Sequence, residues 1–371
     1  MNATLARSSP RSQAWQDLAA LFDPAWRLAD PLADGRALDW HRLYRLATGQ
    51  LVAPQLYARL AAGGRLARVP LEVREALAEL HRLNAQRNTR LRAVLQDTVR
   101  LLNAAGLEPL LLKGAIGLVT DSSPLGMARM LSDLDLALMH GEAADAEALL
   151  RAAGYRDADN IPDPTAYTQH HHHLAPLFHP SGDGYVELHR ALLSHRVPAA
   201  ALPLERVRAM ATPLDWAGAR LWLPCLEHRL THNALHHQVQ NDAFRTDQRD
   251  LRQLLEFAQL RAQAAAATID WAARLAELDR LGCGTAVCAY FLAAQRLFGQ
   301  PLPTGVRPDL AARWAEARFW WLTDRPRWRL ARRYARRLPN LPRRLVTPGW
   351  YPEKVRYLRQ RWWLDRRLHG G

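Results

Sequence analysis

Two acidic residues separated by one position, Asp133 and Asp135, are the residues of this sequence best placed to act together. They lie in the stretch Ser132–Met139, where charged and apolar residues alternate as they do in a β-strand. Side chains two positions apart on a strand share a face and lie about 6.6 Å apart along the backbone. Because two such carboxylates repel each other, the pair predicts a site for Mg²⁺ or Mn²⁺, with a solvated strand edge as the simpler alternative.

A third acid, Glu187, lies in a second alternating stretch that also predicts a strand. Within Tyr185–His189 the alternation places Glu187 and His189 on one face of that strand, and apolar residues on the other. If this strand lies beside the first one, three carboxylates converge on one site. We therefore interpret Asp133, Asp135 and Glu187 as candidate catalytic residues and metal ligands.

Residues upstream of the acids are of the types that bind phosphate. Lys113 and Gly114 follow a short apolar run that predicts a strand, and they precede an expected helix over residues 115–119. A glycine there lets the backbone approach a phosphate, and a helix N-terminus favours negative charge. Arg129, four residues before Asp133, is expected to bind a triphosphate through two parallel hydrogen bonds.

The surrounding sequence predicts helices on both sides of this unit. Apolar residues recur at helical spacing from about residue 12 to 102 and again from about 223 to 298. The pattern indicates an α+β fold, in which a small mixed-sheet core is flanked by N-terminal and C-terminal helical regions. We expect helices over 1–100, the core over 101–195, a helical domain over 196–306 and a helical tail over 307–371.

Several motifs occur in a fixed order: Leu111–Ala115, Arg129–Leu136, Gly154-Tyr155, Val186–His189, and a His-rich stretch from Glu227 to His236 followed by Asp250-Leu251. In this order they resemble the uncharacterised nucleotidyltransferase family of the DNA polymerase β-like superfamily, over roughly residues 12–260. The resemblance implies a nucleotidyltransferase fold with Asp133, Asp135 and Glu187 as the metal triad. It also implies that an NTP such as ATP binds through Lys113, Gly114, Ala115, Arg129 and Ser132.

The function that these features predict is Mg²⁺-dependent transfer of a nucleoside monophosphate from an NTP to an acceptor that the sequence does not identify (a small molecule, a protein or an RNA). An abortive-infection-like toxin that modifies tRNA shares the same motifs and is one alternative. The other is a catalytically silent adaptor that binds nucleotide or associates with a membrane. Ala115 keeps this alternative open, because the superfamily usually has serine or glycine after the motif's glycine.

Two groups of histidines could contribute to the site. The consecutive residues His170–His173 cannot all face one metal on a strand, so we expect a polar loop at the rim of the active site, with a metal site as the alternative. His228, His232 and His236 are spaced by four residues and predict one stripe along a helix. This stripe is expected to cover the catalytic face, and structural packing is the competing interpretation.

The net charge of +14 lies almost wholly in the C-terminal tail. Residues 307–371 hold 18 Lys and Arg against 5 Asp and Glu, and 7 of the 13 tryptophans, whereas the preceding residues hold 32 basic and 31 acidic groups. Arginine mixed with tryptophan is compatible with a packed helical end, with a helix on an anionic membrane, or with a surface that binds nucleic acid. Any contact with a polyanion or an anionic membrane is therefore expected through residues 307–371.

Composition excludes several classes of protein. Apolar residues make up 49% and charged residues 23% of the chain, which is typical of a globular protein and excludes extensive disorder. The three cysteines are too few for a disulfide framework or a four-thiolate zinc site. Met1–Arg11 lacks an apolar segment, and Leu281–Gln295 is too short to cross a bilayer. We therefore expect a cytoplasmic protein, with peripheral association at the inner membrane surface as the alternative.

Overall fold

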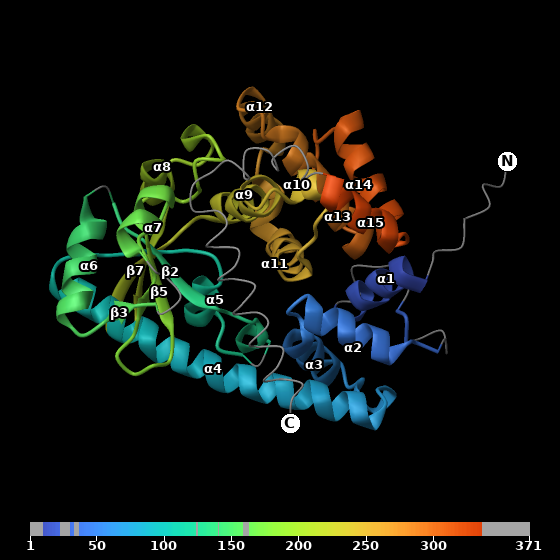
Figure 1. Ribbon diagram of the computed structural model, residues 1–371, viewed down its shortest axis with the longest axis horizontal. Coiled ribbons are helices and arrows are strands. Elements are labelled where there is room, and N and C mark those ends of the chain that lie inside the picture. Colours follow the sequence, from blue (N-terminus) through green and yellow to red (C-terminus); the bar gives the residue numbers. More distant parts are fainter. Residues whose placement is uncertain are drawn as a thin grey trace. The chain divides into compact units, whose positions relative to one another are not determined.

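The computed structural model describes residues 10–22, 30–32, 37–123, 125–139, 141–158 and 163–335. The chain divides into two compact units, Met1–Phe319 and Trp320–Gly371. The first unit contains a seven-stranded mixed sheet with helices before and after it in the chain (Figure 1). This architecture confirms the predicted α+β fold with flanking helical regions.

Four helices precede the sheet: α1 (Pro10–Phe22), α2 (Trp40–Gly49), α3 (Ala53–Ala62) and α4 (Leu71–Ala104). The sheet region contains β1 (Leu110–Leu111), α5 (Ala115–Thr120), β2 (Asp133–Ala137), α6 (Glu142–Ala152), β3 (Arg156–Asp157), α7 (Pro164–His170), β4 (Leu177–Phe178), β5 (Tyr185–His189), α8 (Leu204–Ala209), β6 (Thr212–Trp216) and β7 (Ala219–Leu223). The helices that follow are α9 (Leu226–Leu235), α10 (Ala243–Thr246), α11 (Leu251–Arg261), α12 (Trp271–Arg280), α13 (Gly284–Phe298), α14 (Leu310–Thr323) and α15 (Pro326–Ala335). A π-helical turn, His236–Gln240, continues α9.

The sheet has the strand order β3-β4-β5-β2-β1-β7-β6. Its centre is the parallel pair β2 and β5, and β1 runs antiparallel to β2 on the other side. The strands β6 and β7 extend the sheet beyond residue 195, where the sequence had placed the end of the core. A two-residue turn joins them, with both Ala217 (φ +51°) and Gly218 (φ +76°) in the left-handed region that suits a tight hairpin.

One face of the sheet is apolar because every second residue of β2 and β5 is a buried aliphatic. Leu134 and Leu136 of β2 are both fully buried, as is Val186 of β5. They share one core with the C-terminal half of α4, from Leu91 to Leu102, and with residues of α6. The long helix α4 runs along the sheet at one end and packs against α3 at the other (Figure 1). This packing turns the intervening residues of β2 and β5 towards the opposite face.

In the second unit the structure describes the end of α14 and the helix α15. Trp321 and Trp328 are both exposed, with ring centroids 6.1 Å apart, and the Arg325 guanidinium lies 4.7 Å from the Trp321 ring. Trp320 is buried. Three further tryptophans of the tail, Trp350, Trp362 and Trp363, and its arginines beyond Ala335 lie outside the described residues. Among the described helices, none has both the length and the apolarity needed to cross a membrane.

Two asparagines of α4 attach the segment before β2 to the helix. Asn88, 1% exposed, donates from Nδ2 to the carbonyl oxygens of Met127 (2.8 Å) and Arg129 (2.7 Å). Asn84 donates to the same two oxygens over longer distances, 3.2 and 3.5 Å. Because backbone carbonyls buried without a partner are costly, these bonds determine where Arg129 enters the site.

We expect Asn88→Ala to lower the free energy of unfolding by about 2 kcal/mol, because it removes two well-formed hydrogen bonds from a buried site. Asn84→Ala is the matched control, since it removes longer bonds to the same acceptors and should cost about 1 kcal/mol or less. Urea denaturation of both variants measures the difference. Equal losses in the two variants would show that Asn88 has no special part in holding this segment.

Candidate active site

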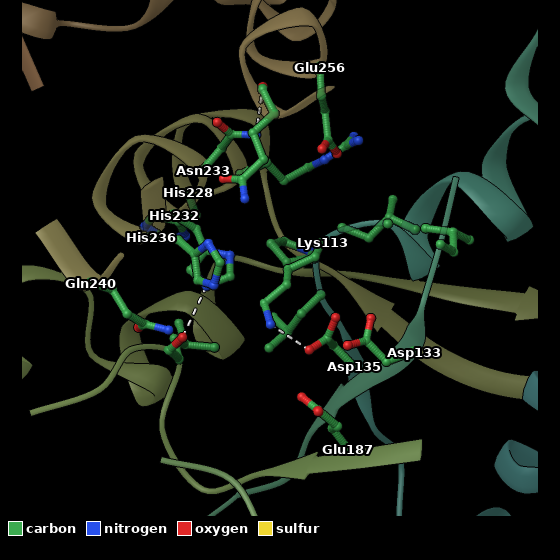
Figure 2. Close-up of a pocket in the computed structure, with 18 of the residues that line it drawn as sticks. Lys113, Asp133, Asp135, Glu187, His228, His232, Asn233, His236, Gln240 and Glu256 are labelled. Atoms are coloured by element: carbon green, nitrogen blue, oxygen red, sulfur yellow. Dashed lines mark hydrogen bonds and ion pairs between the residues drawn. The ribbon is translucent and has the colours of Figure 1, made fainter. Parts of the chain in front are cut away.

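Three carboxylates lie on the polar face of the two central strands. Asp135 of β2 stands directly beside Glu187 of β5, and Asp133 precedes it on the same face. All three line one cavity of about 290 Å³. Figure 2 shows them on one side of this cavity, with Asn233 and Glu256 across from them. The prediction that the three acids lie on adjacent strands around one cavity is confirmed.

Asp135 is the most strongly compensated of the three acids. It is 2% exposed, and its Oδ1 accepts from Lys113 Nζ at 2.6 Å and lies 2.8 Å from His189 Nε2. Burial alone would raise the pKa of Asp135, but the Lys113 ammonium and the His189 ring hold it well below its usual value. Asp135 is therefore ionised at neutral pH, and Lys113 is its direct counter-ion.

The other two acids lack such compensation. Burial and the neighbouring charges of Asp135 and Asp133 raise the pKa of Glu187 to about 8. Burial and the Asp135 charge also raise the pKa of Asp133, whose Oδ1 accepts a hydrogen bond from Ser132 Oγ at 2.9 Å. Lys113 supplies one positive charge among three carboxyl groups, so the cavity favours the arrival of a further cation.

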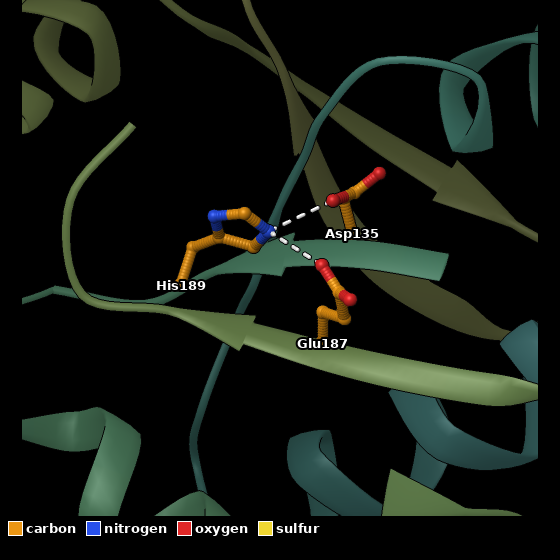
Figure 3. A group of neighbouring side chains, drawn as sticks. All are labelled: Asp135, Glu187 and His189. Carbon is orange, nitrogen blue, oxygen red and sulfur yellow. Dashed lines mark hydrogen bonds and ion pairs between the residues drawn. The ribbon is translucent and has the colours of Figure 1, made fainter. Parts of the chain in front are cut away.

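The donors of three residues come close enough to hold such a cation. Ligand atoms of Asp135, Glu187 and His189 all lie within 4.8 Å of one another. Figure 3 shows the His189 ring directed at the carboxylates of the two neighbouring strands. This set of two carboxylates and an imidazole fits a divalent cation, and it differs from the expected triad by including His189 where Asp133 was placed. The alternation along β5 had already placed His189 on the face of Glu187.

Gly114 is required by a close approach of side chains. Its own backbone is ordinary, with φ −69° and ψ −24°. A Cβ at this position would lie 2.0 Å from both Arg129 Nη1 and Leu131 Cδ2. The preceding residue, Lys113, has φ +49°, in the left-handed region that non-glycine residues seldom adopt. The backbone at Lys113 and Gly114 thus directs the Lys113 ammonium at Asp135 and leaves space for the Arg129 guanidinium.

The remaining expected nucleotide-binding residues are placed in different ways. Arg129 and Ser132 line the cavity. Ala115 is fully buried in the apolar core and is not among the residues that line the cavity. Arg129 is already paired, since its Nη2 donates to Glu256 Oε2 at 2.8 Å. Glu256 lies on α11, far along the chain, and none of the sequence motifs includes it.

The histidine stripe lines the cavity opposite the acids, as one of its two interpretations predicted. His228, His232 and His236 come from α9 and the π-helical turn, and Figure 2 shows them facing the cavity. Burial, joined by the Lys113 charge, lowers the pKa of His232 to about 4. Burial also lowers the pKa of His228 to about 4 and that of His236 well below its usual value. These rings are neutral at pH 7 and offer hydrogen bonds without charge.

The consecutive histidines contribute in part. His172 and His173 line the same cavity, which fits the expected polar loop at its rim. A backbone bridge pairs His173 with His189. Burial lowers the pKa of His172 to about 2 and that of His173 to about 4, so neither carries charge at neutral pH. The side chain of His170 lies outside the described part of the structure.

The raised pKa of Glu187 predicts how stability depends on pH without metal. Because this pKa is about 8 in the folded protein against 4.5 ordinarily, the folded state keeps a proton that the unfolded chain has lost. The contribution of Glu187 to stability is therefore present below about pH 4.5 and is lost as the pH rises through about 8. Glutamine cannot ionise, so Glu187→Gln should gain stability relative to the native protein between pH 6 and 9.

Thermal denaturation in EDTA at pH 6 and at pH 9 measures this effect. We expect the difference in melting temperature between Glu187→Gln and the native protein to increase by a few degrees from pH 6 to pH 9. A change of ~1 kcal/mol in the free energy of unfolding corresponds to about 2–4 °C in a domain of this size. Glu205→Gln, which changes an exposed glutamate of α8, is the control and should show no such trend. A difference that is the same at pH 6 and pH 9 would contradict the assignment.

Comparison with known proteins identifies the family to which the chain belongs. A family model described as an uncharacterised nucleotidyltransferase matches residues 36–299, a range that includes every residue placed in the cavity. The match begins later and ends later than the range of 12–260 inferred from the motifs. No curated protein and no solved structure matches the chain. Because the match spans well over half of its length, the chain belongs to this nucleotidyltransferase family.

Proposed function

We propose that the protein transfers a nucleoside monophosphate from an NTP to a hydroxyl-bearing acceptor with the help of Mg²⁺ or Mn²⁺, as in the DNA polymerase β-like superfamily. The observation that carries this proposal is the register that sets Asp135 beside Glu187, with Asp133 on the same face and Lys113 and Arg129 at the same cavity. Asp135, Glu187 and His189 would hold a divalent cation, and Asp133 would share in binding the metal–nucleotide complex. When bound, the cation neutralises phosphate charge and polarises the reacting phosphoryl group.

The residues of the chain account for the other parts of the reaction. The acceptor oxygen forms a bond to the α-phosphorus, and the bridging P–O bond to the β-phosphate breaks, so that pyrophosphate leaves with the bonding electron pair. Glu187 would accept the hydroxyl proton in its ionised form, which a bound cation favours. Lys113 and Arg129 would steady the phosphates, and the neutral histidine stripe would contact the sugar or the acceptor.

Loss of Asp133 should abolish metal-dependent nucleotide binding. We expect Asp133→Asn to reduce the transfer rate at least ~100-fold, because a metal that stabilises transition-state charge contributes several kcal/mol. Calorimetry with ATP, with Mn²⁺ and then with EDTA, compares this variant with Asp215→Asn, which changes an exposed aspartate on β6. The assignment would be ruled out if ATP bound to the native protein equally well with Mn²⁺ and with EDTA, and bound to Asp133→Asn with the same affinity.

The acceptor is identified by incubating the protein with labelled NTPs and a cell lysate, followed by mass spectrometry. Label on a protein or a small molecule would support the general proposal, whereas label on tRNA alone would indicate a toxin-like activity. Metal-dependent NTP binding without any label transfer would overturn the catalytic proposal and favour a silent adaptor. Asp133→Asn serves in each case as the inactive control.

A further inference from the structure

A second cavity of about 550 Å³ adjoins the active-site cavity. The residues that line both are Gly114, Arg129, Arg229, Glu256 and Leu260. The Arg129–Glu256 ion pair therefore lies at the boundary between the two cavities. Arg129 rests against Gly114, the neighbour of Lys113, so this boundary is directly connected to the acidic site.

Two other arginines lie at this place, and one of them, Arg229, shares the negative charge of Glu256 with Arg129. Arg229 of α9 lines both cavities and Arg59 of α3 lines the second, and both side chains are half-buried. Among the residues that the structure describes, neither side chain makes an ion pair or a hydrogen bond. Burial lowers the pKa of Arg229 and the Glu256 charge opposes this effect in part, so the guanidinium remains charged at neutral pH. A half-buried guanidinium without a hydrogen bond or ion pair of its own is costly unless a ligand supplies further negative charge.

The balance of charge at the boundary selects an anion. Three guanidinium groups, those of Arg59, Arg129 and Arg229, line the second cavity together with the Glu256 carboxylate. The other acid of the second cavity, Asp121, is exposed and accepts a hydrogen bond from the backbone N–H of Ser123. Guanidinium forks match the oxygens of phosphate groups with two parallel hydrogen bonds each. A ligand with several phosphate oxygens therefore fits this boundary better than a single carboxylate.

We propose that the pyrophosphate portion of a nucleotide binds between Arg129 and Arg229 and displaces Glu256 from Arg129. Arg59 provides a further cation in the second cavity, on the side away from the metal-binding acids. Glu256 acts as a resident competitor, since it neutralises Arg129 while no phosphate is bound. This inference rests on the proposed function for its nucleotide, but inorganic pyrophosphate tests the site by itself.

The test measures the affinity for inorganic pyrophosphate by calorimetry in EDTA and low salt, so that no metal contributes. Arg229→Gln should weaken binding by about 10-fold or more, as expected for the loss of charge-assisted hydrogen bonds. Glu256→Gln should tighten binding by roughly 3- to 10-fold, because the competing charge is removed. The control is Arg208→Gln, which removes the same charge from a half-buried arginine that stacks on Trp222 and lines neither cavity. Its affinity should stay within about 2-fold of the native value.

The opposite signs of the two effects separate binding from folding. If the Arg129–Glu256 pair were purely structural, Glu256→Gln would bind pyrophosphate more weakly than the native protein or with the same affinity. Either result would overturn the proposal. Unchanged affinity in Arg229→Gln would also overturn it. Should Arg229→Gln fail to fold, Arg229→Lys replaces it, and lysine is expected to keep only part of the affinity. Pyrophosphate binding that depends on Arg229 would support the proposed phosphate site even if no nucleotidyl transfer were found. Nucleotidyl transfer together with pyrophosphate binding that does not depend on Arg229 would refute the phosphate site and leave the proposed function standing.

Discussion

The repulsion among three carboxyl groups on one face of two parallel strands is the constraint on which the rest of the structure depends. The register of β2 and β5 places Asp135 and Glu187 side by side, at the strand spacing of about 4.8 Å. The apolar core behind the strands prevents either from turning away, because Leu134 and Val186 are fully buried there. Charge compensation must therefore come from groups brought to the polar face.

The neighbouring backbone is shaped by this need. Lys113 adopts a positive φ and reaches Asp135, and His189 approaches the same oxygen from the end of β5. Gly114 leaves the space that the Arg129 guanidinium occupies, and Asn88 holds the carbonyl of Arg129 from α4. Strain at Lys113 costs of order 1–3 kcal/mol, which the surrounding packing must offset. The contact with Asp135 therefore outweighs the intrinsic backbone preference of Lys113.

The sequence predicted the parts of the site that follow from short-range periodicity. Strand alternation placed Asp133, Asp135 and Glu187 correctly, and a spacing of four residues placed the histidine stripe. The hairpin of β6 and β7 was missed, because its only local signal is the pair Ala217-Gly218 between short apolar runs. The pairing of Arg129 with Glu256 joins residues 127 positions apart, and no periodicity reports such a contact. The adaptation of Gly114 to a side chain was equally invisible, since a glycine in a sequence does not show what approaches it.

The cavity is divided by charge in a way that restricts what can fill it. One wall carries three carboxyl groups with one lysine, and the facing histidines are neutral. The boundary to the second cavity carries an excess of guanidinium groups. A lone metal ion would satisfy only the acidic wall, and a lone polyanion would satisfy only the guanidinium groups while being repelled by the acids. A divalent cation bound to a polyphosphate satisfies both at once, because its positive and negative parts are separated along one molecule. Complementarity of this kind supports the proposed binding of a metal–nucleotide complex over either component alone, and it would place the phosphate tail of that ligand towards Arg129.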